Sequence, residues 1–397
     1  MARPYDIAIA GGGLAGALVA LALARHHPEL RVALVEAGDT IGGNHIWSFF
    51  ATDIAPAHRA LVEPLIAARW DEGYKVVFPR FSRVLDTPYR SITSERLDAA
   101  VRAALAPEQV MTGVTVSRVA ADGITLDDGS VVAAHGVIDA RGIAAQDVAL
   151  LRGGWQKFTG QMLTLERPHG LQRPVVMDAS VVQHDGYRFV YCLPFSSHEV
   201  FVEDTYYSDT PELDLALLKQ RIAEYAQGHG WTIAHVSRTE TGVLPVVSGA
   251  GHTAFASVFA QGTGVAGVRA GLFQPLTSYS LPDAVRFAHE LAALDDLGSA
   301  ALARFSQRYA AHHWRSRRFY RTLTAMLFGA AAPKDRYKVL ERFYTLDDAL
   351  IERFYAGQGT FGDKARVLAG KPPVPLSAAI LALAGSGAPG FLETKRQ

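Results

Sequence analysis

The first forty residues alternate between apolar runs and glycine-rich turns. Residues 5–10 form a short apolar run bounded by glycines, which is typical of a buried parallel strand. Small and apolar residues then recur at helical spacing over residues 14–23, and residues 31–36 form a second apolar run. The chain therefore opens with a predicted strand, tight turn, helix and second strand.

Further patterns follow along the chain. They predict strands over 70–81, a helix over 93–105, an antiparallel meander over 111–134 with turns at Asp122-Gly123 and Asp128-Gly129, a strand over 136–142, β-rich structure over 158–205, a helix over 211–230, and strands over 231–247 and 254–260. Ser280 and Asp283 resemble a capping box, which predicts a helix from there to Leu294. Residues from 297 onward are helical in character.

Three glycines fit the pattern G-x-G-x-x-G between the first strand and the first helix. Gly11 makes the turn, Gly13 lets the backbone approach a pyrophosphate, and Gly16 lets the helix pack closely on the strand. Glu36 follows 20 residues after Gly16, at the end of the second strand, where a carboxylate accepts hydrogen bonds from ribose hydroxyls. The motif also occurs as a purely steric turn, but the surrounding elements favour an adenine dinucleotide, and FAD and NAD both remain open.

These elements predict an α/β protein with an α+β second domain. We expect a discontinuous dinucleotide-binding domain over 1–75, 90–155 and 251–300, and a β-rich substrate domain over 76–89 and 156–250. A helical C-terminal region should cover 301–397.

Composition narrows the function classes. The chain has 397 residues with 39 basic and 39 acidic side chains, so no overall charge indicates a nucleic-acid partner. Cys192 is the one cysteine, so an internal disulfide is excluded and a reducing compartment is favoured. We expect Cys192 to be a small buried side chain. The histidine spacings match no metal motif, so we expect no metal. We also expect neither a signal peptide nor a spanning helix.

Residues 297–333 contain no acidic side chain. Six arginines fall in this stretch and an apolar run follows them: Arg304, Arg308, Arg315, Arg317, Arg318 and Arg321. One interpretation is a helix that lies on an anionic membrane surface. The other is an amphipathic helix that packs on the core and presents a basic face to solvent.

Two adjacent carboxylates stand in the run F-V-E-D-T-Y-Y. Glu203 and Asp204 should point to opposite faces of a strand, so one can enter an aromatic-lined cavity while the other is solvated. Desolvation would raise the pKa of the buried carboxyl and keep a proton available. The alternative is an acidic turn after an edge strand.

The sequence resembles the bacterial lycopene β-cyclases over nearly its whole length. The resemblance rests on GGGLAG with Glu36, GGNHIWSF (42–49), GYRFVY (186–191), FVEDTYY (201–207), RAGLF-P (269–275), YSLP (279–282), RFY (342–344), RFYAG (353–357) and GKPPVP (370–375). It implies an FAD fold like that of the aromatic hydroxylases and geranylgeranyl reductases. It also implies an intramolecular lyase or isomerase that closes the acyclic ends of lycopene and related carotenes to β-rings. The family uses reduced FAD without net redox change, with NAD(P)H as reductant, and such an enzyme would be cytoplasmic and peripheral on the inner face of the cell membrane.

The resemblance also assigns site residues. It makes Glu203 the essential acid. We expect the cofactor to contact Gly11, Gly13, Leu14, Ala15, Gly16, Glu36, Ala37, Asn44, His45, Asp139, Arg141, Gly142, Gly271, Leu272, Phe273 and Gln274. We expect the substrate or a cationic intermediate to meet Trp47, Phe201, Asp204, Tyr206 and Tyr207.

Three positions depart from the family pattern. The family usually reads F-H-P-T-T-G-Y-S where this chain has Gln274, Leu276 and Ser278 in place of His, Thr and Gly. Two other functions stay open: a redox flavoenzyme, either a monooxygenase or an isoprenoid reductase, and a non-catalytic carotenoid- or flavin-binding protein. The sequence also leaves open whether one or both ends are cyclised.

Overall fold

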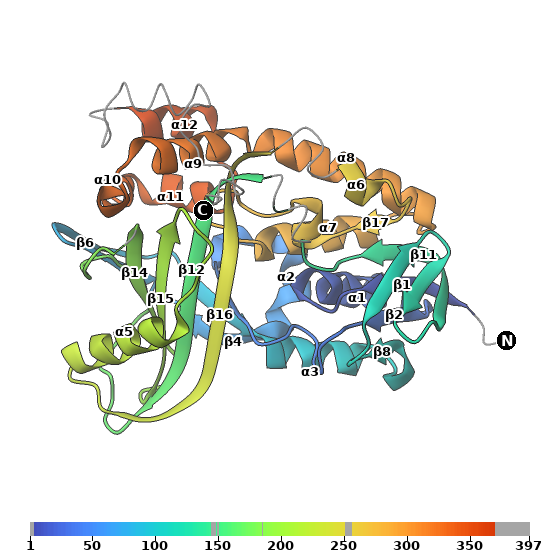
Figure 1. The fold of residues 1–397 in the computed structure, drawn as a ribbon, viewed down its shortest axis with the longest axis horizontal. Helices are drawn as coiled ribbons and strands as arrows, with labels where there is room; N and C mark the ends of the chain where they lie inside the picture. The colour runs from blue at the N-terminus through green and yellow to red at the C-terminus, as the bar shows by residue number, and fades with distance from the viewer. Residues whose placement is uncertain (1–3, 144–147, 149–150, 185, 251–255, 370–397) are drawn as a thin grey trace, which may run out of the picture.

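The protein is described by a computed structural model over residues 4–143, 148, 151–184, 186–250 and 256–369. Figure 1 shows a sheet with its helices on the right, a long twisted sheet on the left, and a layer of helices across the top. Among these residues no helix combines the length and the apolar character needed to cross a bilayer.

The first sheet contains the predicted strand–helix–strand unit. Its strands run in the order β8-β2-β1-β11-β10-β9, with β17 beside β11. Their bounds are β1 (Tyr5–Ala10), β2 (Val32–Val35), β8 (Val110–Met111), β9 (Val116–Ala120), β10 (Gly123–Leu126), β11 (Val131–Asp139) and β17 (Gly264–Val265). β1 pairs in parallel with β2 and β11, whereas β9, β10 and β11 form the predicted antiparallel meander.

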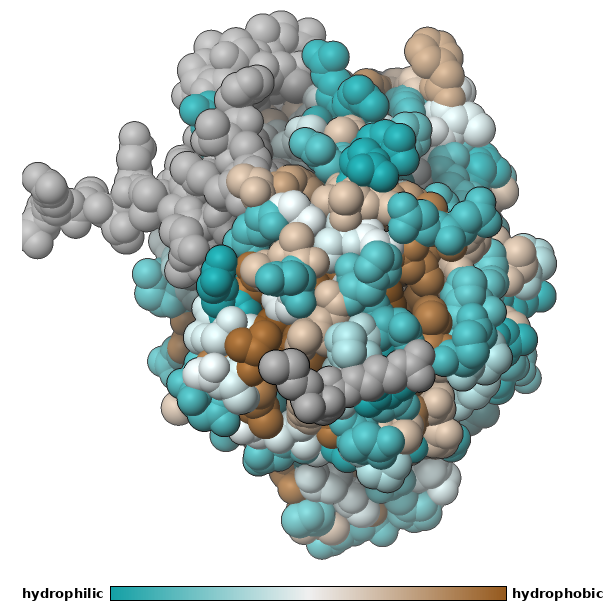
Figure 2. All heavy atoms as spheres, turned by 90° about the vertical axis from the view of Figure 1, so that its right-hand side faces the viewer, coloured by the Kyte–Doolittle hydropathy of each residue, from teal (hydrophilic) through white to brown (hydrophobic). Residues whose placement is uncertain are grey.

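Helices cover this sheet and bury its apolar side chains. α1 (Leu14–His26) packs against α3 (Ser94–Ala104) and α7 (Leu281–Ala292), and α8 (Ser299–Ser316) packs on β11 and β17. Ile9 and Leu34 are fully buried, as expected for strands covered on both faces. Figure 2 looks onto this end of the molecule, where hydrophilic residues predominate and hydrophobic ones show in small groups between them.

The second sheet carries most of the middle of the chain. Its order is β16-β12-β15-β14-β13-β5-β6. The bounds are β5 (Tyr74–Phe78), β6 (Phe81–Leu85), β12 (Leu151–Leu165), β13 (Val175–Asp178), β14 (Tyr187–Pro194), β15 (Glu199–Ser208) and β16 (Ile233–Ala250). The hairpin of β5 and β6 therefore leaves the N-terminal part of the chain to join this sheet. A small third sheet comprises β3 (Ile46–Phe50), β7 (Tyr89–Thr93) and β4 (Ile66–Trp70).

The two faces of the second sheet have different covers. α5 (Leu215–Gly228) packs on one face, where Ile222 and Ala226 join Val190, Cys192 and Val202 in one apolar cluster. Helices from the C-terminal part of the chain cover the opposite face: α9 (Arg318–Ala330), α10 (Tyr337–Phe343), α11 (Asp348–Tyr355) and α12 (Phe361–Leu368). Cys192 is buried as predicted, and burial raises the pKa of its thiol to about 12.

Several local predictions were wrong. Residues 256–259 form a short helix, α6 (Ala256–Phe259), rather than part of a strand over 254–260, and residues 254–255 lie outside the described residues. α5 starts at Leu215 rather than 211, because the Asp214 side chain caps it by accepting a hydrogen bond from Leu217 N at 3.0 Å. α7 ends at Ala292, two residues before the predicted Leu294.

The predicted capping box at the start of α7 is absent. The Ser280 side chain makes no capping hydrogen bond. Asp283 instead accepts a hydrogen bond from Arg317 Nη2 at 3.0 Å and also pairs with Arg286. Arg317 is consequently buried, with 6% of its surface exposed, and cannot serve the membrane surface that the sequence suggested for it.

Candidate active site

Strand β15 lies inside the second sheet, between β12 and β14, and carries both carboxylates of the F-V-E-D-T-Y-Y run. Asp204 faces α5 and is fully buried, and Arg188 donates to it from Nε at 2.9 Å. This buried ion pair satisfies Asp204 on that face. Asp204 is therefore a structural residue here, and it does not belong among those that face a substrate.

Glu203 points to the opposite face and lines a cavity of about 700 Å³. The other lining residues are Gln156, Val176, Met177, Tyr187, Phe189, Tyr191, Tyr207, Leu276, Thr277, Tyr279, Leu327, Leu340, Phe354 and Tyr355. Thr205 Oγ1 donates a hydrogen bond of 2.5 Å to Glu203 Oε1. The cavity thus combines one carboxyl group with aromatic and aliphatic walls.

The environment of Glu203 favours its neutral form. Part of the side chain stays accessible because it lines the cavity, yet protein surrounds it on all sides. Burial, together with the negative charges of Glu240 and Asp204, raises the pKa of Glu203 to about 8, and the hydrogen bond from Thr205 acts in the opposite direction. A proton is therefore available on this carboxyl at neutral pH.

Glu240 is a candidate site residue that the sequence analysis did not identify. On β12, Gly160 pairs with Glu203 on one side and with Glu240 of β16 on the other, so both carboxyl groups lie on the same face of the sheet. Glu240 is the one carboxylate of β16, and this could be seen in the sequence. The strand register that brings Glu240 beside Glu203 could not.

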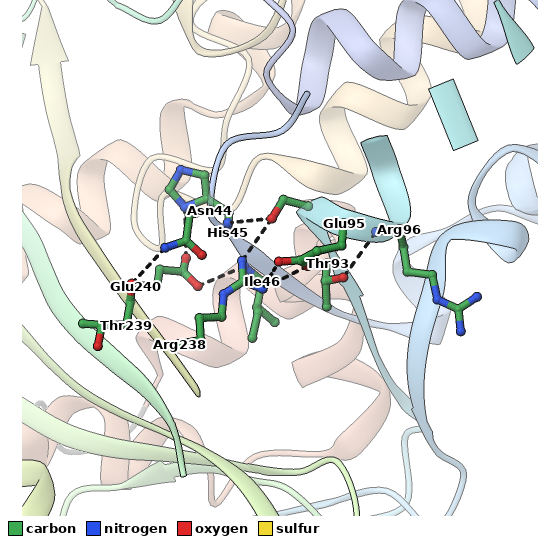
Figure 3. A network of polar contacts seen from close by, with 10 residues as sticks. Asn44, His45, Ile46, Thr93, Glu95, Arg96, Arg238, Thr239 and Glu240 are labelled. Carbon is green, nitrogen blue, oxygen red and sulfur yellow. Dashed lines mark hydrogen bonds and ion pairs between the residues drawn. The ribbon is translucent and has the colours of Figure 1, made fainter. Parts of the chain in front are cut away.

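A network of polar contacts fixes Glu240, as Figure 3 shows. His45 Nδ1 lies 3.0 Å from Glu240 Oε1, and Ile46 N donates to Oε2 at 3.0 Å. Next to them, Asn44 Nδ2 donates to Thr239 O at 2.8 Å. The loop that carries Asn44 and His45 is therefore bound to β16, at the residues of the sheet that lie in register with Glu203.

Hydrogen-bonded tyrosines form part of the cavity wall. Tyr89 OH lies 2.6 Å from Tyr191 OH and 2.9 Å from Tyr279 OH. Burial raises the pKa of all three phenols, so they stay neutral and offer electron-rich ring faces. Tyr191 and Tyr279 belong to the motifs GYRFVY and YSLP, but the sequence alone assigned no role to either.

The four predicted aromatic residues divide between several places. Phe201 and Tyr207 share the Glu203 face of β15, and Tyr207 lines the cavity. The Phe201 ring covers Gly160 so closely that a Cβ there would lie 2.1 Å from its Cζ. Tyr206 faces the other side, where Lys157 Nζ lies 4.7 Å from its ring centroid. Trp47, on β3, lies beside His45, with ring centroids 5.5 Å apart.

The glycine turn before α1 leaves space for a ligand. Gly11 has a φ of +98°, and a Cβ there would lie 2.8 Å from Ala140 C; a Cβ on Gly16 would lie 2.0 Å from Gly11 O. A Cβ on Gly13, in contrast, would meet nothing within 4 Å. Gly11 and Gly16 are therefore required by the fold, while the space beside Gly13 matches the close approach of a pyrophosphate.

Other predicted cofactor residues gather around the same turn. The Glu36 carboxylate accepts hydrogen bonds from Gly12 N at 2.6 Å and from Gly38 N at 2.8 Å. Glu36 therefore adjoins the glycine turn, and Ala37 lies beside it. At the end of β11, Asp139 Oδ2 pairs with Arg141 at 2.7 Å and with Arg269 at 2.8 Å. Arg269 also donates to Gly142 O at 3.1 Å.

The three departures from the family pattern lie in the segment after Gly271, Leu272 and Phe273. Gln274 Oε1 accepts hydrogen bonds from Leu276 N at 2.6 Å and Thr277 N at 3.2 Å. Ser278 adopts a φ of +55°, a conformation that favours glycine, and its hydroxyl donates to Pro245 O at 2.7 Å. The Nε2 of Gln274 is buried without a protein partner, which leaves a donor for a bound group.

Among the described residues, no group of three or more His, Cys, Asp or Glu side chains is placed to hold a metal ion.

Solved structures of other proteins share this fold. A geranylgeranyl bacteriochlorophyll reductase-like protein from Thermoplasma acidophilum superposes with a TM-score of 0.54 at 13% identity, covering 97% of this chain and 96% of that one. A flavin-dependent halogenase from Xanthomonas campestris gives 0.54 at 14% identity, covering 96% and 98%. At these identities the likeness shows the fold alone, and it confirms the predicted class.

Comparisons of sequence are more specific. The family model for lycopene cyclase proteins matches residues 6–381. A lycopene beta-cyclase from Pseudescherichia vulneris is 44% identical over 374 residues, covering 94% of this chain and 96% of the relative. One from Pantoea ananas is 41% identical over 379 residues, covering 96% and 98%. The chain therefore belongs to the lycopene cyclase family.

Proposed function

We propose that this chain is a lycopene β-cyclase, which closes the acyclic ends of lycopene to β-rings through acid catalysis by Glu203. The observation that carries the proposal is a carboxyl group that keeps its proton at neutral pH inside a cavity lined by tyrosines and aliphatic side chains. Family membership supplies the substrate class, and related acyclic carotenes fit the same chemistry.

The reaction needs one proton and no net oxidation. The Glu203 carboxyl donates its proton to the terminal double bond, which leaves a tertiary cation at the neighbouring carbon. The electron pair of a nearby double bond attacks that carbon, the ring bond forms, and the charge moves to a ring carbon. Loss of a proton from the adjacent carbon gives the product, and the Glu203 carboxylate formed in the first step is available as the base.

The cavity stabilises the cation and excludes competing reactions. Neutral tyrosine rings such as Tyr191 and Tyr279 present electron-rich faces to the positive charge. Glu240 contributes negative charge from the same face of the sheet. The apolar walls exclude water, which would otherwise trap the cation.

We infer that FAD is the cofactor and that NAD(P)H reduces it. Gly11, Gly13, Gly16 and Glu36 would bind the adenine dinucleotide, and the unpartnered Gln274 Nε2 supplies a donor farther along the site. Reduced FAD, when bound, supplies negative charge that stabilises a cation without consuming electrons. The division into a discontinuous dinucleotide-binding domain, a substrate domain and a helical region remains part of this proposal.

Substitution of Gly13 tests the cofactor assignment. Gly13→Val should fold, because a Cβ there meets no protein atom within 4 Å, but it should weaken FAD binding at least roughly tenfold by blocking backbone contacts to charged phosphate. Fluorescence titration with FAD measures the affinity. Gly228→Val is the control, because it adds the same side chain to open space in α5. Equal FAD affinity in both variants would show that the assignment is wrong.

Substitution of Glu203 tests the acid. Glu203→Gln keeps the shape of the side chain and removes the transferable proton, so cyclisation should fall at least about a hundredfold while FAD binding persists. Products from lycopene in liposomes with FAD and NAD(P)H, without oxygen, are identified by chromatography. Glu199→Gln on the exposed end of the same strand should behave as wild type. Normal cyclisation by Glu203→Gln would exclude the residue, and stoichiometric NAD(P)H loss would favour a redox enzyme instead.

We further propose that the protein is peripheral on the cytoplasmic membrane face. Arg315 and Arg318 are exposed, and Phe319, next to Arg318, meets α12, whose Lys364 Nζ lies 5.9 Å from the Phe319 ring centroid. On α12, Phe361 is 88% exposed. Arg317 has no part in this surface. Each arginine near anionic lipid contributes about 1 kcal/mol, so Arg315→Glu with Arg318→Glu should weaken co-sedimentation with anionic vesicles. Equal wild-type binding to neutral and anionic vesicles would contradict the electrostatic part.

A further inference from the structure

A second cavity adjoins the one that holds Glu203. Leucine, valine, methionine and phenylalanine side chains line it, together with Arg342. Four side chains line both cavities, namely Leu276, Leu327, Leu340 and Phe354. The two spaces are therefore separated by shared side chains and not by a layer of backbone.

The two cavities differ in chemistry. Apart from Arg342, the described side chains that line the second cavity are apolar. The Arg342 guanidinium donates a hydrogen bond to the backbone oxygen of Ala369. The first contains Glu203 and all the lining tyrosines. An occupant of the second cavity must be apolar, and it meets no group there that could donate a proton or stabilise a cation through a phenol ring.

The second cavity lies among the helices that cover the sheet, on the side of the shared residues away from Glu203. Most of its walls come from α9, α10, α11 and α12, the helix layer at the top of Figure 1. Leu368 at the end of α12 is 50% exposed. The second cavity therefore adjoins the Glu203 cavity and is walled in part by α9 and α12, the helices that carry Arg318 and Phe361.

We propose that the second cavity binds the unreacted distal part of the linear polyene while one end of the molecule reacts at Glu203. This inference rests on the proposed function. A linear carotene is much longer than its reacting end group, and the remainder is wholly apolar. The two cavities meet at a wall of four side chains, which a chain that occupies both would have to displace. Burial of hydrocarbon against apolar walls supplies binding energy remote from the reacting bond.

Blocking the second cavity alone provides the test. Val339 lines it but not the Glu203 cavity, and its side chain is half-buried, so Val339→Trp should fill the space while FAD binding is kept. The kcat/KM for lycopene should fall at least about tenfold, the cost of displacing roughly two buried methylene groups. A short acyclic polyene with the same end group should be cyclised as by wild type. Lys338→Trp, at the adjacent position of α10, where the side chain is 41% exposed, is the matched control.

The outcomes separate the inference from the proposed function. Unchanged lycopene turnover in Val339→Trp, or an equal loss with long and short substrates, would overturn the inference while wild-type cyclisation leaves the function standing. Failure of wild type to cyclise either substrate would overturn the function itself. If Val339→Trp does not retain FAD, wild type is cross-linked with a polyene that carries a photoreactive group at its unreacted end. Labels in α9, α10, α11 or α12 support the inference, and labels confined to other elements overturn it.

Discussion

Two adjacent carboxyl groups in the middle of a buried sheet are the constraint on which this structure depends. Side chains alternate along a strand, so the two carboxyl groups lie on opposite faces of the sheet. The free-energy cost of burying a carboxyl group is offset in a different way on each face. Asp204 pairs with Arg188 beneath α5, and this contact opposes the rise in the pKa of Asp204 that burial causes. Glu203 instead faces a cavity beside Glu240 and retains a proton. The same sheet thereby holds a buried ion pair and the proposed catalytic acid at neighbouring positions.

The structure around Glu203 comes from distant parts of the chain, which explains the limits of sequence reasoning. The βαβ start, the meander and the roles of Gly11 and Gly16 depend on local patterns and were predictable. The opposite directions of Glu203 and Asp204 followed from strand alternation alone. Glu240 could not be predicted as its neighbour, because that requires the register of β12 with both β15 and β16. Arg317 was misread because a basic run in sequence does not show which member finds a buried partner.

The segment from Gln274 to Ser278 shows how a departure from a family pattern can be accommodated. Ser278 takes a backbone conformation that glycine adopts more readily, and its hydroxyl bonds to Pro245 O in return. Gln274 accepts two backbone N–H groups of the same turn, so the turn is stabilised by side chains. Leu276 adds an apolar wall shared by both cavities. The substitutions thus preserve a defined turn beside the reactive cavity.

The protonation state of Glu203 is the central claim, and infrared difference spectroscopy between wild type and Glu203→Gln measures it most directly. Because the folded-state pKa is raised to about 8, the neutral carboxyl should dominate at pH 7 and disappear as the pH rises through 8. The account predicts a carbonyl band of a protonated carboxyl at pH 7 that shifts in heavy water and is lost at higher pH. A carboxylate band at pH 7, with no protonated form until strongly acidic pH, would contradict it.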